Sequence, residues 1–141
     1  MKWSPSDCAP GDMIRVRIGS VFHYGIFVSE DEVIAFGMPP LPDFGSDPDR
    51  FLVCATDIDT FCCGKIPEVG TPDRSEKKKR FSADETIARA RARIGESGYH
   101  IIRNNCEHFA YECAFGEHRS LQEEAVFRVW SKKSPLIKKR D

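Results

Sequence analysis

The segment Asn105-Cys106-Glu107-His108-Phe109 places a thiol at the expected start of a helix. Apolar residues recur at i, i+3, i+4 and i+7 from Cys106 to Cys113, which predicts a helix with Cys106 at the edge of its buried face. Unpaired N–H groups and the positive end of the helix dipole lie at such a position, and both lower the pKa of a thiol. The same N–H groups can stabilise the oxyanion that forms when sulfur attacks a carbonyl. The segment therefore indicates a nucleophilic cysteine, with Asn105 and Glu107 as capping or oxyanion residues.

His23 is the candidate base for this thiol. It lies in the apolar run 21–28, which is typical of a strand. A buried cysteine or a lone strand histidine is usually a simple core residue. A histidine on a strand and a cysteine at a helix start nevertheless form the thiolate–imidazolium pair of papain-like cysteine hydrolases. The two residues together predict nucleophilic catalysis more strongly than either residue alone.

The first half of the chain predicts strands with short connections. Turn signals and apolar runs predict an antiparallel meander, because the connections are too short for parallel crossovers. We expect loops at 37–50 and 64–80, and residues 57–63 are ambiguous between a loop and a further strand. The expected strands are residues 13–18, 21–28, 32–36 and 51–55.

The second half of the chain changes to helical periodicity. A capping box at Ser82–Glu85 predicts a helix that ends at Gly95, with Ile87, Ala90 and Ile94 inward. A short strand is expected at 98–102. The helix from Cys106 is expected to end before Gly116, and a last helix is expected from Ser120. Strands followed by helices indicate an α+β fold.

Composition excludes several classes of function. The 141 residues include 21 Lys and Arg against 22 Asp and Glu, a balance that argues against nucleic-acid binding. No apolar run is long enough to span a membrane, and the N-terminus lacks a signal-peptide core, so we expect a cytoplasmic protein. The six cysteines include no C-x-x-C pair, so neither a metal nor another cofactor is predicted.

Four segments together resemble the lecithin:retinol acyltransferase family, including its H-Ras-like-suppressor phospholipase/acyltransferase branch. Residues 10–14 are similar to the family's entry motif, and residues 23–28 to its histidine-bearing strand. Residues 105–109 are similar to its most specific signature, and residues 116–122 to the segment that follows it. The resemblance covers about residues 10–36 and 81–126.

The resemblance implies a permuted papain-like fold over residues 8–131, followed by a basic tail at 132–141. It implies that Cys106 accepts an acyl chain as a thioester and that His23 is its base. The expected activity is that of a cysteine acyltransferase or a phospholipase A-type acyl hydrolase. Its partner would be an acyl-bearing lipid or another acyl donor, with peripheral membrane contact through the basic residues as a further expectation.

One position departs from the family pattern. Family members usually carry a second polar residue, commonly His, twelve positions after the first, where it orients the base; here that residue is Ala35. A turn centred near Ser29 would place residue 35 directly across from His23. Because Ala35 cannot hydrogen-bond an imidazole, His100 is the candidate substitute. His108 is interpreted as structural, because its helical angle turns it away from Cys106.

Three functions stay open from the sequence. The leading hypothesis is a thiol-dependent acyl hydrolase or acyltransferase that acts on lipid esters. The first alternative is a cysteine peptidase or amidase, since the same chemistry cleaves amides. The second is a non-catalytic interaction module that kept the fold and lost an oriented base, which the alanine at position 35 favours.

Overall fold

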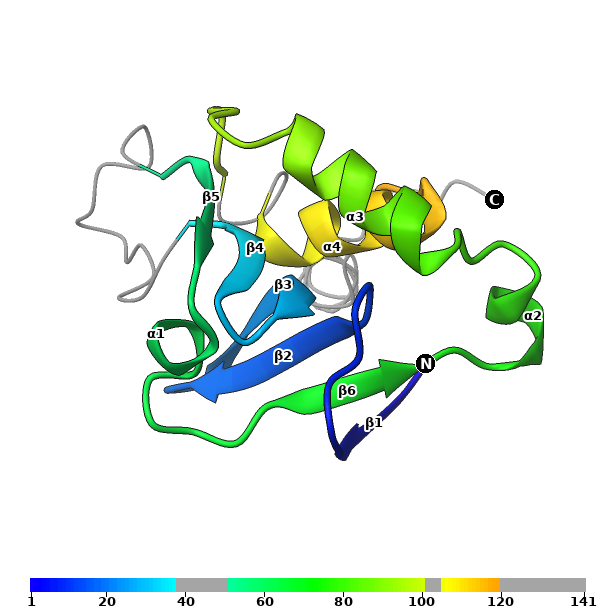
Figure 1. Ribbon diagram of the computed structural model, residues 1–141, viewed down its shortest axis with the longest axis horizontal. Coiled ribbons are helices and arrows are strands. Elements are labelled where there is room, and N and C mark those ends of the chain that lie inside the picture. Colours follow the sequence, from blue (N-terminus) through cyan, green and yellow to red (C-terminus); the bar gives the residue numbers. More distant parts are fainter. Residues whose placement is uncertain (38–50, 101–104, 120–141) are drawn as a thin grey trace, which may run out of the picture.

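The computed structural model describes residues 1–37, 51–100 and 105–119. Six strands form one sheet in the order β1-β6-β2-β3-β4-β5, and every neighbouring pair is antiparallel (Figure 1). The described helices lie outside this sheet, and the α+β class is confirmed. The strands are β1 (Lys2–Pro5), β2 (Met13–Ile18), β3 (Val21–Ser29), β4 (Glu32–Phe36), β5 (Val53–Thr56) and β6 (Glu68–Thr71). The helices are α1 (Ile58–Cys62), α2 (Arg74–Lys77), α3 (Ala83–Ala92) and α4 (Cys106–Phe115).

The meander β2-β3-β4-β5 confirms the four strands predicted from the sequence. Two expectations for the middle of the chain are wrong. The ambiguous segment 57–63 is helix α1, because the Asp57 side chain caps it and accepts a hydrogen bond from the Thr60 N–H at 2.7 Å. The expected loop 64–80 holds β6 and α2. In β6, Val69 is buried and lies opposite Ile14 of β2.

Two of the three helices predicted for the second half are observed with small changes. The Ser82 side chain caps α3 by accepting the Glu85 N–H at 3.1 Å. Helix α3 ends two residues before Ile94, whose side chain is 46% exposed, so the inward position expected for Ile94 is wrong. Gly116 ends α4 in the left-handed conformation, with φ 72°. The helix expected from Ser120 lies outside the described residues.

The register between β3 and β4 differs from the expected one. Ile26 lies opposite Ile34 and Phe27 opposite Val33, with an irregularity between Phe27 and Ser29. When this register is extended, Ala35 lies beside Gly25 and not directly across from His23. The difference arises because β3 continues through Ser29 and the turn comes later than expected.

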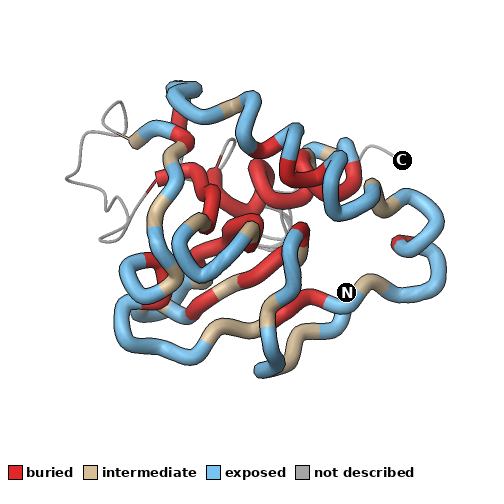
Figure 2. Tube along the Cα trace, viewed as in Figure 1, coloured by how far each residue is buried: buried red, intermediate tan, exposed pale blue. Residues whose placement is uncertain are grey.

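Each face of the sheet carries its own buried cluster. The α4 cluster is the set of buried side chains that packs around α4; it includes Tyr24, Ile26 and Cys106. The α1 cluster packs around α1 on the other face and includes Phe27 and Phe61. Figure 2 shows burial concentrated in the central strands and in α4. Every residue of α4 except Glu112 is buried, so α4 is covered on more sides than its apolar stripe predicted.

None of the helices in the described ranges is long and apolar enough to cross a membrane.

Candidate active site

The start of α4 is fixed by a reciprocal cap. The Asn105 side chain accepts hydrogen bonds from the N–H groups of Glu107 at 3.0 Å and His108 at 3.2 Å. In return, the His108 ring accepts the Asn105 N–H at 3.2 Å through Nδ1. Asn105 therefore caps the helix, and His108 has the structural place expected for it. Together they hold Cys106 at the first position of α4.

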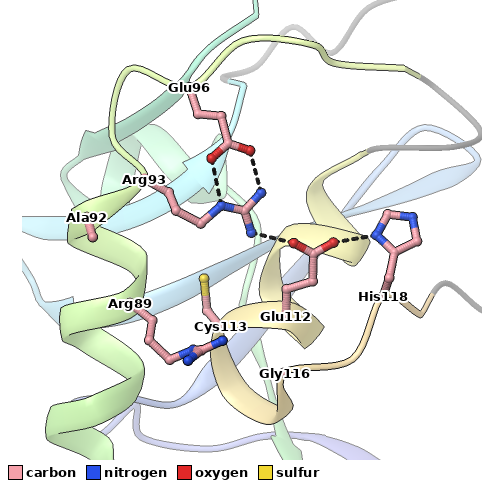
Figure 3. A pocket seen from close by; sticks show the side chains of 8 residues that line it. All are labelled: Arg89, Ala92, Arg93, Glu96, Glu112, Cys113, Gly116 and His118. Carbon is pink, nitrogen blue, oxygen red and sulfur yellow. Dashed lines mark hydrogen bonds and ion pairs between the residues drawn. The ribbon is translucent and has the colours of Figure 1, made fainter.

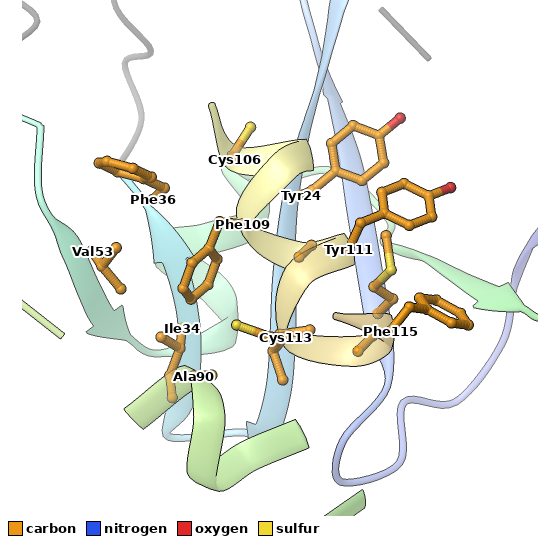
Figure 4. Close-up of a cluster of buried hydrophobic side chains, with 14 of the residues drawn as sticks. Tyr24, Ile34, Phe36, Val53, Ala90, Cys106, Phe109, Tyr111, Cys113 and Phe115 are labelled. Atoms are coloured by element: carbon orange, nitrogen blue, oxygen red, sulfur yellow. The ribbon is translucent and has the colours of Figure 1, made fainter. Parts of the chain in front are cut away.

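The Cys106 thiol is buried against the backbone of β3. Its side chain lies among those of the α4 cluster (Figure 4), and the residue is 3% exposed. Its Sγ donates to the carbonyl oxygen of Phe22 at 4.0 Å. Tyr24, two residues along β3, turns its N–H toward the same sulfur. The thiol therefore lies next to the strand that carries His23.

Burial raises the pKa of the Cys106 thiol to about 12. The N–H groups of Tyr24, Cys106 and Glu107 act in the opposite direction, and the charge of Glu107 raises the pKa further. The lowered pKa expected from the helix start is therefore wrong for this arrangement, because the loss of hydration outweighs the N–H groups. The thiol is protonated near neutral pH.

The His23 imidazole is fully buried at 0% exposure. Its ring stacks on Phe61 of α1, with ring centroids 4.8 Å apart and planes at 30°. Gly25 makes room for this contact, because a Cβ there would lie 2.8 Å from Phe61 Cε2. Neither ring nitrogen has a hydrogen-bond partner within the described structure. Burial lowers the pKa of His23 to about 3, so the ring is neutral.

The structure does not bring His23 and Cys106 face to face. Successive side chains of a strand point to opposite faces. Tyr24 and Ile26 pack in the α4 cluster with Cys106, whereas Phe27 packs in the α1 cluster with Phe61. Since His23 stacks on Phe61, its imidazole is on the α1 face of β3. The thiol contacts the backbone of β3, and the imidazole projects from the other side.

The other histidines lie apart from this pair. His108 is buried and stacks on His118, with ring centroids 4.0 Å apart. His118 also contacts the carboxylate of Glu112 through Nδ1. Its ring therefore has protein partners, although it lies in the loop after α4. His100 is exposed and forms an isolated strand bridge. Nothing in the described contacts brings it to His23.

Sequence reasoning missed Tyr24, whose N–H acts on the Cys106 sulfur, and Arg15, which contacts the Tyr24 hydroxyl. Burial, followed by the charge of Glu107, raises the pKa of the Tyr24 hydroxyl. Arg15 donates to that hydroxyl at 3.5 Å and to Glu68 at 2.9 Å. The position of Tyr24 next to His23 in the apolar run 21–28 could have indicated it. Adjacent residues of a strand point to opposite faces, so when both faces are buried the neighbour of a buried residue is buried on the other face.

A pocket of about 610 Å³ lies near the C-terminal ends of α3 and α4 (Figure 3). Its walls are mainly charged: Arg93 forms ion pairs with Glu96 and Glu112, both at 2.6 Å. Its thiol, Cys113, is protonated near neutral pH, because burial raises its pKa to about 11. Cys106 does not line this pocket, whose walls are Arg89, Ala92, Arg93, Glu96, Glu112, Cys113, Gly116 and His118.

Within residues 1–37, 51–100 and 105–119, no cluster of three or more His, Cys, Asp or Glu side chains could hold a metal ion.

A family model and several similar proteins that match this chain carry the same description. The family model described as "Lecithin retinol acyltransferase" matches residues 6–119. The lecithin retinol acyltransferase of Mus musculus is 27% identical over 135 residues, which are 83% of this chain and 58% of that protein. The protein of that name from Bos taurus is 32% identical over 125 residues, which are 75% of this chain and 54% of that protein. The Homo sapiens protein is 30% identical over 125 residues, with the same coverage. The chain therefore spans less than two-thirds of the length of each relative.

Proposed function

The chain belongs to the lecithin retinol acyltransferase family, and on that ground we propose that it transfers acyl groups through a thioester on Cys106. Membership in the family supports acyl transfer or acyl hydrolysis as the general activity. The observation that carries the specific proposal is the place of Cys106 at the capped start of α4, where its own N–H and that of Glu107, together with the Tyr24 N–H of β3, act on one sulfur. The same groups can stabilise the oxyanion of an attacked carbonyl.

The proposed reaction has two steps. The Cys106 sulfur attacks the carbonyl of a lipid ester, its proton passes to the His23 imidazole, and the released alcohol takes up that proton. Water, or another alcohol or an amine, then cleaves the thioester and restores the thiol. The acyl-bearing lipid is the proposed partner, and the basic tail at 132–141 is the proposed membrane contact.

This mechanism requires a local rotation of β3 at His23. In the structure His23 pairs with Val16 of β2, while the described pairing of β3 with β4 stops at Ile26. A rotation at residue 23 therefore breaks ladder hydrogen bonds on one side of the strand only. It also requires the ring to leave Phe61, where burial keeps it neutral.

A second candidate function is a non-catalytic interaction module of the same family. The specific observation that favours it is the placement of His23 and Cys106 on opposite faces of β3. The alanine at position 35, which is fully buried and cannot hydrogen-bond an imidazole, favours it as well.

The test is the capture of an acyl-enzyme. We expect incubation with 4-nitrophenyl butyrate, or with a phospholipid in vesicles, to add one acyl group to Cys106, detected by intact mass and peptide mapping. Cys106→Ala should abolish the adduct, whereas Cys113→Ala on the same helix should leave it in place. If no donor acylates the folded protein at Cys106, the interaction module is the better account.

A separate variant tests the base. His23→Gln should abolish acylation while circular dichroism still reports a folded protein. If acylation continues at the wild-type rate, His23 is a packing residue and the proposed proton transfer is wrong, although the role of Cys106 stands.

A further inference from the structure

A small cavity lies between α2 and the C-terminal half of α4. Its volume is about 80 Å³. Sites for drug-sized ligands start at about 300 Å³, so only a small ion or the head group of a larger molecule fits here. Cys106 does not line this cavity, whose described walls are Ser75, Glu76, Lys79, Tyr111, Phe115, Glu117 and Arg119. We call it the α2–α4 cavity.

The Tyr111 hydroxyl is a buried donor in the wall of this cavity. The residue is 1% exposed, and its hydroxyl has no hydrogen-bond partner within the described structure. Figure 4 shows the hydroxyl pointing away from α4 and from the apolar side chains around it. Burial raises the pKa of Tyr111 to about 12, so the group keeps its proton and can donate it. Because a buried polar group without a partner is unfavourable, an acceptor in the cavity would stabilise the protein.

Two cationic side chains line the same cavity and are only loosely paired. Lys79 Nζ lies 3.1 Å from Glu117, but both side chains are exposed, and such pairs contribute little to stability. Arg119 Nη1 lies 3.6 Å from Glu76, which is longer than a normal hydrogen bond. The Arg119 guanidinium also lies 5.5 Å from the centroid of the Tyr111 ring. Both cations can therefore turn their N–H groups toward a new acceptor.

The charges around the cavity favour an anion. Residues 73–80 include five basic residues and two acidic ones. The acidic pair forms the cap of α2: Asp73 accepts the Glu76 N–H at 2.8 Å, and Glu76 accepts the Asp73 N–H at 3.0 Å. Lys77 and Lys78 are exposed, and neither takes part in a described ion pair. The excess of positive charge attracts anions to this end of the molecule.

We infer that the α2–α4 cavity binds a phosphate group, held by the Tyr111 hydroxyl, the Arg119 guanidinium and the Lys79 ammonium. A phosphate group offers three strongly accepting oxygens, which matches three donors from three segments of the chain. A guanidinium binds two of these oxygens in parallel, and an ammonium adds a point charge. The phosphate comes from a small molecule in solution or from a lipid head group. This ligand binds apart from the Cys106 thiol, and its binding requires no acyl transfer.

The first experiment is the titration of the full chain with inorganic phosphate by isothermal calorimetry at constant ionic strength. Tyr111→Phe removes one oxygen atom and keeps the ring, so circular dichroism should still report a folded protein. We expect this variant to raise the Kd for phosphate about tenfold, the effect of one lost hydrogen bond to a charged group. Lys79→Gln and Arg119→Gln should each raise the Kd by a similar factor.

Two control variants lie outside the cavity wall. Lys78→Gln removes the same charge one residue before Lys79, and should raise the Kd less than about twofold, because an exposed charge at a distance is screened. Tyr24→Phe removes a buried hydroxyl that already contacts Arg15 at 3.5 Å, and should leave the Kd unchanged. Equal effects of Lys78→Gln and Lys79→Gln would assign the binding to the general positive field and overturn the inference.

The second experiment identifies the source of the phosphate. The wild type and Tyr111→Phe are compared with glycerol 3-phosphate in solution and with phosphatidylcholine vesicles that contain or lack phosphatidic acid. Tyr111-dependent binding of inorganic phosphate or glycerol 3-phosphate supports a soluble ligand. Tyr111-dependent binding only to vesicles with phosphatidic acid supports a lipid head group. If none of these probes binds, or if Tyr111→Phe binds them as well as the wild type does, the inference is wrong.

Discussion

Burial keeps both candidate catalytic groups uncharged. The Cys106 thiol has a raised pKa of about 12 and the His23 imidazole a lowered pKa of about 3, so neither ionises near neutral pH. A thiolate–imidazolium pair exists only where each charge stabilises the other. Under the proposed mechanism, this arrangement must therefore open before Cys106 can be acylated.

Thiol labelling reports that opening directly. Cys63 is exposed and follows α1, whereas Cys106 is buried and protonated. We expect iodoacetamide at neutral pH to label Cys63 in the native protein well before Cys106, because alkylation requires an accessible thiolate. Peptide mapping over time measures both rates. Faster labelling of Cys106 would mean that the open arrangement dominates in solution.

His23 should make the protein sensitive to mild acid. Its pKa falls from 6.5 to about 3 on folding, so the unfolded chain binds more protons between those values. The free energy of unfolding therefore decreases as the pH falls below about 6.5, by about 2 kcal/mol down to pH 5.

His23→Leu should remove this dependence, since leucine has a similar volume and no charge to bury. It should also stabilise the protein by about 1–3 kcal/mol near neutral pH, because an unpartnered buried polar group is replaced. Urea unfolding from pH 5 to pH 7 measures both effects. A pH slope that persists in the variant would assign the acid sensitivity to another group.

Helix α1 is held on the sheet by the fit of Phe61 onto Gly25. A Cβ at position 25 would approach Phe61 Cε2 to 2.8 Å and Val33 Cγ1 to 3.1 Å. We expect Gly25→Ala to destabilise the protein by about 1–3 kcal/mol through overpacking. The cost is steric, since the φ angle of Gly25 is not positive.

A double-mutant cycle tests that origin. In a Phe61→Ala background the new methyl group has space, so Gly25→Ala should cost much less there than in the wild type. If Gly25→Ala lowers the free energy of unfolding equally in the two backgrounds, Gly25 is required by strand β3 itself and not by the contact with α1.

The sequence was sufficient for elements with strong local signals. Apolar runs bounded by turn signals indicated β2, β3 and β4, and side-chain caps marked the starts of α3 and α4. Strand β6 was missed because it has only four residues and pairs with β1 and β2, which are far away in sequence. A local sequence pattern does not indicate a pairing between strands that are far apart in the chain.

The candidate site was predicted in its parts but not in its geometry. The position of Cys106 at the helix start followed from apolar spacing and the asparagine cap. The side of the sheet that α4 covers did not follow, because β3 is buried on both faces from His23 to Phe27. When both faces of a strand are apolar, the sequence pattern does not indicate which face a given side chain occupies. A shift of one residue in register then moves every side chain to the other face of the sheet.

Across the whole molecule, Arg93 joins three separate segments. Its guanidinium pairs with Glu96, in the loop after α3, and with Glu112 of α4, and it lies over Phe109 at 5.0 Å. Because the side chain is 21% exposed, these contacts are only partly screened by solvent. Arg93 therefore connects α3, its following loop and α4.

We expect Arg93→Gln to lower the free energy of unfolding by about 1–2 kcal/mol, since Glu96 and Glu112 both lose their ion pair with Arg93 and only Glu112 keeps a second contact, with His118. Arg89→Gln is the matched control on the same helix. Arg89 is 42% exposed and its contact with Glu85 is 3.8 Å long, so its loss should cost less than about 0.5 kcal/mol. Similar losses in the two variants would show that the Arg93 ion pairs add nothing specific.

The strand order β1-β6-β2 also affects the order in which the chain folds. The strands β2, β3 and β4 follow one another through short connections, whereas Pro5 meets Glu68 across a long stretch of chain. Closing a long loop costs more conformational entropy than closing a hairpin. The central hairpins can therefore assemble early and offer the free edge of β2 as a template, on which β6 and then β1 are added last.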